Sequence, residues 1–480
     1  MLVTLYKTTD LSYERPMAVQ REKDTICAVS TPHGVGGISV IRISGSQALA
    51  ITKKVAGFLP AQPESHKIFF GTFKDRNASA IDEVLVSYFA NGRSFTGEET
   101  LEISCHGSPQ ICDSILSELI FFGARAADRG EFTYRAFMNG KLDLVQAEAV
   151  LSMIESQSKS SSKLALRQLK GELSDKFNKI IDHLTWSLAH IEAGIDFSTE
   201  GLDVIDHSAL TQKLRFIQEA IRPLVVNFEQ GRLLKDGVRV VLLGRPNVGK
   251  SSLLNQLLGY DRAIVSDIAG TTRDVVEGSL LHKGVKFTIV DTAGLRESSD
   301  QIENMGIKRS LQQQQEADVV LFVIDAKAGL SNEDFKFLDF ASSSQFFFVL
   351  NKSDLIDGDR EVFANIEQQL RNKFPSLQGG FLVSALALED REKLLSGLFS
   401  SLGILNFEND VLISQSRQYE NLLVVEKNVS QALQQLESGI GSEFVAFELK
   451  EALMKLQEII GVRFDDQIMD RVFKEFCIGK

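Results

Sequence analysis

The hydrophobic and polar positions of the chain follow two different periods. In the middle of the sequence, short runs that are apolar throughout alternate with segments of helix length. These runs occupy residues 238–243, 287–290, 319–324, 346–350 and 381–383. Strands of this kind are buried on both faces, as in a doubly wound, mostly parallel sheet with helices on either side. The pattern therefore predicts an α/β domain over residues 237–403.

On both sides of this domain, apolar residues recur at steps of three and four, which is the spacing of one helical face. The longest such run extends from Leu166 to Ile195 and predicts one helix, although Gly171 would weaken it by about 1 kcal/mol. Two further runs, over residues 422–436 and 449–460, predict helices near the C-terminus.

The order of these segments indicates a multidomain chain. Residues 142–236 and 404–480 are expected to form the two parts of a helical domain into which the α/β domain is inserted, although two separate helical domains would give the same pattern. Residues 24–141 are expected to form an N-terminal α+β domain, and residues 1–23 a short extension. Strands are predicted at 38–43 and 81–89, and helices at 109–122 and 143–157.

Length and composition agree with this division. The 480 residues amount to about three domains at roughly 150 residues each. No run approaches the roughly 18 apolar residues of a membrane span. The first 20 residues are interrupted by Lys7, Asp10 and Glu14 before an apolar core of signal-peptide length could form. We therefore expect neither a membrane partner nor secretion.

Charge and cysteine content narrow the class of protein further. The 52 Lys and Arg residues stand against 64 Asp and Glu residues, which gives a net charge of −12. Any binding of nucleic acid would therefore need a local basic surface. The four cysteines, Cys27, Cys105, Cys112 and Cys477, form neither a disulfide framework nor a paired metal motif. A reducing compartment, the cytoplasm, is expected.

A phosphate-binding loop follows the first strand of the α/β domain. Residues 244–251 read Gly-Arg-Pro-Asn-Val-Gly-Lys-Ser and match the G-x-x-x-x-G-K-S pattern before a segment compatible with a helix. In this pattern backbone N–H groups hold the phosphates, Lys250 reaches the β and γ phosphates, and the Ser251 hydroxyl binds Mg²⁺. The loop by itself predicts only an enzyme that binds a nucleoside triphosphate.

Four further segments select GTP. Residues 291–294, Asp-Thr-Ala-Gly, end a strand where a carboxylate can hold the magnesium shell, and Thr272 is a candidate Mg²⁺ ligand before them. Asp354 ends the Asn-Lys-Ser-Asp segment and can accept two hydrogen bonds from guanine N1–H and its amino group. Ser384 and Ala385 stand where a backbone N–H can meet the guanine O6. The residues assigned to GTP are Asn247, Val248, Gly249, Lys250, Ser251, Ser252, Ser266, Asp267, Ile268, Ala269, Gly270, Thr271, Thr272, Asp291, Thr292, Ala293, Gly294, Asn351, Lys352, Ser353, Asp354, Ser384 and Ala385.

The group that orients the attacking water is not fixed by these motifs. Leu295 follows the Asp-Thr-Ala-Gly segment, at the position where Ras-like GTPases place a glutamine. Four charged residues nearby could take its role, and the pattern does not choose among them. They are Arg296, Glu297, Asp300 and Glu303.

The segments outside these motifs resemble the MnmE (TrmE) family of tRNA-modifying GTPases. The resemblance runs from about residue 24 to the last residue, and its motifs are more specific than those shared by many GTPases. They occupy residues 31–38, 42–45, 95–98 with Glu102, 130–133, 135–143, 291–297 and 476–480.

This resemblance implies a folate-binding N-terminal domain that forms a homodimer. It also implies that the α/β domain over residues 237–403 is a G domain whose K⁺-dependent dimerisation activates GTP hydrolysis. It implies an FAD-containing partner of the MnmG (GidA) type in a heterotetramer, with FAD bound only by that partner. The implied reaction adds a carboxymethylaminomethyl or aminomethyl group to C5 of the wobble uridine of certain tRNAs. The one-carbon unit would come from 5-formyl- or 5,10-methylene-tetrahydrofolate.

Residue roles also follow from the resemblance. Positions Asn247, Ser266, Ile268 and Thr271 match the family's K⁺ ligands. Glu303 matches the glutamate that orients the attacking water through a second water. The positions that match the folate site are Arg42, Glu102, Lys141 and Lys480, and Lys480 can reach that site only if the end of the chain docks on the N-terminal domain. Cys477, in the terminal Cys-Ile-Gly-Lys, is a candidate catalytic residue of the modification reaction.

Two other functions agree less well with the sequence. A ribosome-assembly or RNA-binding regulatory GTPase would usually carry a basic RNA-binding domain, whereas the chain is acidic and residues 464–470 near its end are acidic too. A folate methyltransferase that works alone is disfavoured because the chain has no flavin or dinucleotide fingerprint.

Overall fold

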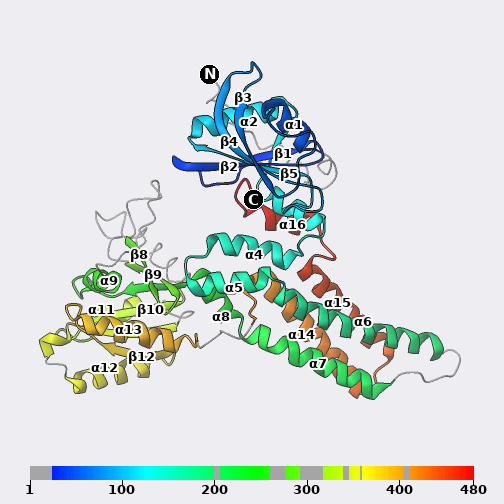
Figure 1. Ribbon diagram of the computed structural model, residues 1–480. Helices are drawn as coiled ribbons and strands as arrows, with labels where there is room; N and C mark the ends of the chain where they lie inside the picture. Colours follow the sequence, from blue (N-terminus) through cyan, green and yellow to red (C-terminus); the bar gives the residue numbers. More distant parts are fainter. Residues whose placement is uncertain are drawn as a thin grey trace, which may run out of the picture. The chain divides into compact units, whose positions relative to one another are not determined.

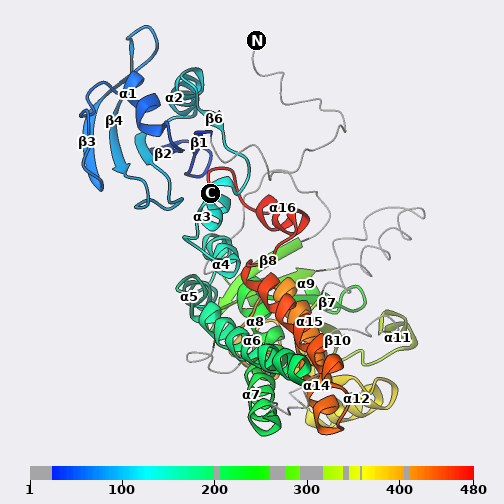
Figure 2. The same ribbon diagram turned by 90° about the vertical axis from the view of Figure 1, so that its right-hand side faces the viewer.

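The computed structural model describes residues 24–198, 206–259, 276–291, 317–338, 345–356, 359–404 and 411–480. These residues form two compact units (Figures 1 and 2). The first unit contains the described residues up to 151 together with 168–217 and 424–480, and the second contains those of 152–167 and 218–423. None of the described helices is long and apolar enough to cross a membrane.

A six-stranded sheet forms the N-terminal part of the first unit, with strand order β3-β4-β5-β2-β1-β6. All neighbouring strands are antiparallel except β1 and β6. Helices α1 and α2 contribute buried residues to the apolar core on one face of the sheet. The elements are β1 (Ile26–Val29), β2 (Gly36–Ser44), α1 (Ala48–Val55), β3 (Lys67–Lys74), β4 (Ala80–Phe89), β5 (Thr100–Gly107), α2 (Pro109–Phe121) and β6 (Arg125–Ala126).

The other described elements outside the sheet of the second unit are helices. Helices α3 (Glu131–Met138), α4 (Leu144–Glu155) and α16 (Asp466–Lys474) share an apolar cluster. Long helices complete this part of the fold: α6 (Glu172–Ser198), α7 (His207–Val226), α14 (Ser416–Glu437) and α15 (Ser442–Ile460).

The single helix predicted from Leu166 to Ile195 is wrong. The chain forms α5 (Lys159–Leu169) and α6, and Gly171 lies between them with a backbone φ of +88°. This left-handed conformation suits glycine and ends a helix. The apolar period continues across the break because both helices bury one face, so periodicity alone did not reveal it.

The second unit is built around a doubly wound sheet with strand order β12-β11-β10-β7-β9-β8. Only β8 runs antiparallel to its neighbour. Side chains of α9 and α13 pack on one face, and those of α11 and α12 on the other. The elements are α8 (Phe228–Asp236), β7 (Val238–Leu243), α9 (Lys250–Leu258), β8 (Val276–His282), β9 (Val285–Asp291), β10 (Val319–Asp325), α11 (Asn332–Leu338), β11 (Gln345–Asn351), a 3₁₀ turn (Ser353–Ile356), α12 (Arg360–Lys373), β12 (Leu377–Leu382) and α13 (Leu388–Ser401).

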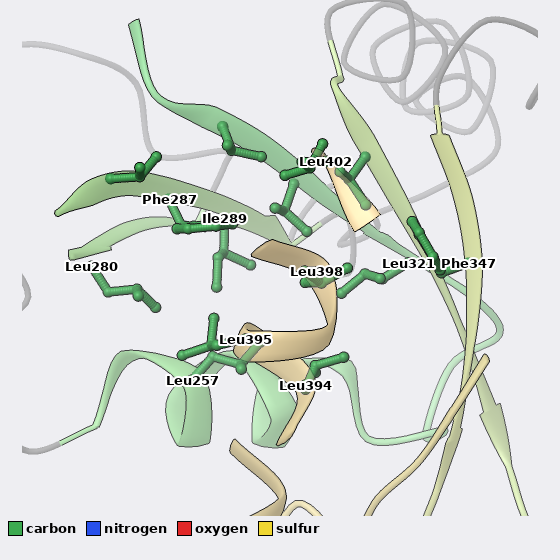
Figure 3. Close-up of a cluster of buried hydrophobic side chains, with 14 of the residues drawn as sticks. Leu257, Leu280, Phe287, Ile289, Leu321, Phe347, Leu394, Leu395, Leu398 and Leu402 are labelled. Atoms are coloured by element: carbon green, nitrogen blue, oxygen red, sulfur yellow. The ribbon is translucent and has the colours of Figure 1, made fainter. Parts of the chain in front are cut away.

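Figure 3 shows the core on the α9 and α13 side, where Leu257 and Leu394 face the side chains of the sheet. The central strands have no polar face because both of their faces are covered, and β10 is buried at every position except its last residue. The apolar runs predicted as strands are confirmed for this reason. The carboxyl ends of β7, β9, β10 and β11 lie along one edge, which places the nucleotide motifs together.

Candidate functional site

The phosphate loop connects β7 to α9, and two glycines allow its path. Gly244 has φ +140°, and a Cβ there would lie 2.4 Å from the carbonyl oxygen of Val323. Gly249 has φ +95°, and a Cβ there would lie 2.3 Å from Nδ2 of Asn351. Any side chain at either position would push the loop away from the sheet.

Lys250 and Ser251 begin α9 inside this loop. The ammonium of Lys250 donates to the carbonyls of Gly244 and Arg245, over 2.8 and 2.7 Å. The hydroxyl of Ser251 donates to Oδ2 of Asp291 over 2.7 Å, at the end of β9. Hydroxyl and carboxylate oxygens are the hard ligands that Mg²⁺ prefers, so the donor set fits this ion.

The guanine motif meets the phosphate loop through Asn351. Its Nδ2 donates to the carbonyl of Val248 over 2.9 Å, and its Oδ1 accepts from the N–H of Ala385 over 3.1 Å. The carboxylate of Asp354 accepts from the hydroxyl of Ser384 over 2.6 Å. The segments that contain these residues, far apart in the sequence, therefore form one site.

Lys352 also joins the two loops. Its ammonium donates to the carbonyl of Asn247 over 3.0 Å and to Oδ2 of Asp325 over 2.6 Å. Burial would raise the pKa of Asp325, but the ammonium of Lys352 and the N–H groups of Lys327 and Ala328 lower it below its usual value. Asp325 thus stays ionised and holds Lys352 in place.

Three carboxylates that support the site were not identified from the sequence. Asp325 follows the apolar run of β10, so its position at a strand end could have indicated it. Asp334 is fully buried and accepts from Nε of Arg245 over 2.8 Å, and Asp390 accepts from the N–H of Ser384 over 2.9 Å. These two have no motif, because their partners meet them only in the folded chain.

Many of the predicted nucleotide residues lie outside the described residues. They are Ser266, Asp267, Ile268, Ala269, Gly270, Thr271, Thr272, Thr292, Ala293, Gly294 and Glu303. Of the predicted K⁺ ligands, only Asn247 is described, and it has a left-handed backbone with φ 64°.

A second site lies on the N-terminal sheet, where Arg42 of β2 stands opposite Glu102 of β5. Nη2 and Nε of Arg42 donate to Oε1 of Glu102 over 2.8 and 3.0 Å. The guanidinium lies 5.6 Å from the ring centroid of Phe95 and 5.5 Å from that of Phe132, in cation–π contact with both. Two predicted folate residues are thus side by side between aromatic rings.

The end of the chain docks beside this pair. The carbonyl of Lys480 accepts from the N–H of Phe132 over 3.2 Å, and that of Gly479 accepts from the Ser30 hydroxyl over 3.1 Å. A short antiparallel bridge joins Arg129 to Ile478. The end of the chain therefore docks on the N-terminal domain, as Lys480 requires in order to reach the candidate folate site.

Lys141 and Cys477 lie at the margins of the same region. The ammonium of Lys141 donates to the carbonyl of Gly92 over 2.9 Å, in the loop that contains Phe95. Cys477 is exposed, whereas the other cysteines are buried. Burial raises the pKa of Cys27 and of Cys105 to about 12, which keeps both thiols protonated.

A partly buried ionic network holds α3 against the sheet. Arg135 donates to Asp24, Glu98 and Glu131 over 2.9 to 3.1 Å, and Arg125 donates to Asp24 and Glu131. Burial would raise the pKa of Glu131, but its hydrogen bonds to Arg125 and the charges of both arginines lower it. This network fixes the helix that carries Phe132 and leads to Lys141.

Both sites lie in segments that match known protein families. The family description "MnmE helical domain" matches residues 144–477, and "GTP-binding protein TrmE N-terminus" matches residues 25–141. A tRNA modification GTPase MnmE of Bdellovibrio bacteriovorus is 55% identical over 472 residues, which cover 96% of this chain and 98% of the relative. One of the same name from Pseudothermotoga lettingae is 38% identical over 458 residues, which cover 95% and 100%.

Among solved structures, the Era protein of Aquifex aeolicus bound to GDP and AlF4⁻ is 29% identical to this chain. The match covers 40% of this chain and 66% of the Era chain, with a TM-score of 0.29.

Proposed function

The chain belongs to the MnmE family of tRNA modification GTPases and is a P-loop GTP hydrolase, and we propose that it modifies C5 of the wobble uridine. The group added would be carboxymethylaminomethyl or aminomethyl, with tetrahydrofolate as the source of one carbon. The observation that supports this most directly is the docking of the chain's end beside Arg42 and Glu102, because it brings residues of both candidate folate segments together.

GTP and Mg²⁺ are the ligands of the site on the second unit. Lys250 would neutralise the β and γ phosphates, and Ser251, hydrogen-bonded to Asp291, would hold Mg²⁺, which lowers the charge on the reacting phosphates. Asp354 would accept the two N–H donors of the guanine edge, while Asn351 keeps the guanine and phosphate loops at a fixed separation. Glu303 would orient the attacking water.

Potassium is proposed as an activating ion beside the phosphates. Asn247 would be one ligand, with Ser266, Ile268 and Thr271. A monovalent cation there supplies the positive charge that an arginine finger supplies in other GTPases. Equal rates of GTP hydrolysis in potassium and sodium salts would contradict this role.

The tetrahydrofolate derivative is proposed to bind at the Arg42–Glu102 pair. Arg42 donates to Oε1 of Glu102, which leaves Oε2 to accept from the N–H edge of a pterin. Arg42, Lys141 or Lys480 would bind the carboxylates of the glutamate tail. The rings of Phe95 and Phe132 offer apolar faces beside them. Cys477, close in sequence to Lys480 and exposed, would take part in the modification itself.

A homodimer through the N-terminal domain is part of the proposal. Ile68 and Phe70 lie two positions apart on β3, on the face opposite to the core, and are 65% and 66% exposed. Phe70 pairs with Leu85 of β4, which is 45% exposed. Apolar side chains gathered on a sheet face are typical of an interface. We further propose an FAD-containing partner of the MnmG type in a heterotetramer, and a cytoplasmic location.

The test is mass spectrometry of tRNA nucleosides from cells that lack this gene, with and without the gene restored. We expect loss of C5-modified wobble uridine and its return on complementation. An unchanged nucleoside profile would reject the modification function and leave a ribosome-assembly or RNA-binding regulatory GTPase as the better account.

A further inference from the structure

Helix α6 and the first part of α7, which lie in the first unit, carry a stripe of basic and aromatic side chains. Positions on α6 that are spaced by three and four residues share one helical face. Those that form the stripe are Lys176, Lys179, His183, Trp186 and His190, and Lys213 and Phe216 join them from α7. Asp175 and Asp182 border the stripe.

The rings in this stripe are ordered by contacts with each other. The rings of Trp186 and His190 stack with centroids 3.6 Å apart, and Nδ1–H of His190 donates to the carbonyl of Trp186 over 2.8 Å. The ammonium of Lys213 lies 4.4 Å from the Trp186 ring centroid. His190 is nevertheless exposed, so one end of the stack is open to a further ring.

A second pair extends the ordered surface. The ring of Phe216 lies 4.5 Å from that of His183, and Phe216 is 44% exposed. The Lys213 ammonium donates to Nδ1 of His183 over 3.4 Å. Burial and the charge of Lys213 lower the pKa of His183, which keeps that ring neutral at pH 7. The stripe therefore combines fixed aromatic rings with the exposed charges of Lys176 and Lys179.

From these observations we propose that the stripe is an RNA-binding surface that contacts tRNA, a role that rests on the proposed function and adds to it. Exposed rings can stack on unpaired bases, and lysines beside them can neutralise phosphates. The net charge of −12 makes such a local surface necessary for an anionic partner.

Trp186 allows a direct test because it is the only tryptophan of the chain. The full-length protein is titrated with an unmodified tRNA transcript that has uridine at the wobble position, and Trp186 emission is followed together with the anisotropy of a labelled copy of the same RNA. We expect the emission to change over the range in which the anisotropy shows binding. Emission that stays constant at saturation would place the RNA elsewhere.

Charge reversal tests the lysines. The double variant Lys176→Glu, Lys179→Glu is expected to bind tRNA about fivefold or more weakly, and to lower the slope of log K against log salt by about 1 to 2. The matched control is Lys427→Glu, Lys450→Glu, on exposed positions of α14 and α15, which changes the net charge equally and is expected to keep the wild-type slope. His190→Ala, which removes the open ring and no lysine, is expected to weaken binding about fivefold with the slope unchanged.

Two results would overturn the proposal. The first is unchanged affinity and slope in the Lys176, Lys179 variant. The second is that this variant keeps its affinity for tRNA but no longer binds an FAD-containing partner, since the stripe would then be a protein interface. The proposed function is judged separately, by the nucleoside profile of cells that lack the gene. Circular dichroism of each variant confirms that the helices are intact.

Discussion

Nδ2 of Asn351 donates a hydrogen bond of 2.9 Å to the carbonyl of Val248, so the guanine motif and the phosphate loop are held together by one side chain. The same side chain accepts from the N–H of Ala385. Asn351 is 1% exposed, and water therefore cannot replace it. The geometry of the nucleotide site depends on this residue even though it is not expected to touch the phosphates.

We predict that Asn351→Ala lowers the free energy of unfolding of the G domain by about 1 to 3 kcal/mol, because it leaves the buried carbonyl of Val248 and the partly buried N–H of Ala385 without this partner. It should also weaken GTP binding, since the loops lose their fixed separation. Urea denaturation and nucleotide titration measure the two effects. Asn365→Ala, on the exposed face of α12, is the control, and an equal loss there would contradict the assignment.

Asp354→Asn should change which base is bound. A carboxylate accepts two hydrogen bonds, whereas an amide offers one acceptor and one donor. That pattern matches the N1–H and C2 carbonyl of xanthine instead of guanine. We expect GTP affinity to fall at least tenfold and affinity for xanthosine triphosphate to rise, measured by competition with a labelled nucleotide. A variant that keeps its preference for GTP would remove Asp354 from base recognition.

Burial should decide the value of two similar ion pairs in the G domain. Asp334 pairs with Arg245 at 2.8 Å and is fully buried, whereas Glu367 pairs with Arg371 at 2.7 Å and is 28% exposed. Asp334→Asn is expected to cost about 3 kcal/mol of unfolding free energy, and Glu367→Gln less than 1 kcal/mol. Denaturation of both variants gives the comparison. Similar losses in the two variants would show that burial does not decide the value of these ion pairs.

The motifs could be read from the sequence because each is a short loop with its chemistry encoded in consecutive residues, as in Lys250 and Ser251. The strands of the G domain were predicted because both of their faces are buried. β8 was missed, since it is an edge strand in which Leu280 is buried and Leu281 exposed.

Contacts between residues that are far apart in the sequence could not be predicted in this way. Arg245 and Asp334 are 89 positions apart, and no local sequence pattern predicts their contact. The pairing of Arg42 with Glu102 likewise depends on strand register, which the alternation of β2 alone does not fix. The resemblance to a family made these two residues candidates for the folate site, but only the folded sheet shows that they are in contact.

His282 should make the stability of the G domain depend on pH. Burial lowers its pKa, with help from the charges of Lys283 and Arg391, while the carboxylate of Glu392 at 3.9 Å acts in the opposite direction. The unfolded chain therefore binds a proton more readily. Stability is fully present above about pH 6.5 and falls as the pH drops below that value.

The check is the melting temperature of the protein between about pH 8 and about pH 5.5, in the range where histidines titrate. Glu392→Gln should steepen the loss of stability at low pH, because it removes the charge that opposes the shift. His282→Asn should reduce that loss. If His282→Asn keeps the wild-type pH dependence, another group is responsible.

Gly479 connects the docking of the chain's end to folate binding. Its φ is +93°, and a Cβ would lie 2.1 Å from the carbonyl oxygen of Val29, so Gly479→Ala should displace the tail from the N-terminal domain. If Lys480 binds the folate, affinity for 5-formyltetrahydrofolate should fall at least tenfold, as measured by calorimetry.

The control is Gly439→Ala, where φ is +67° and no atom lies within 4 Å of the added Cβ. That substitution carries the same kind of backbone strain, about 1 kcal/mol, without a clash, and should leave the affinity unchanged. Because GTP binds to the other unit, GTP hydrolysis without tRNA should stay at the wild-type rate in both variants. Wild-type folate affinity in Gly479→Ala would show that the docked tail does not contribute Lys480 to the site.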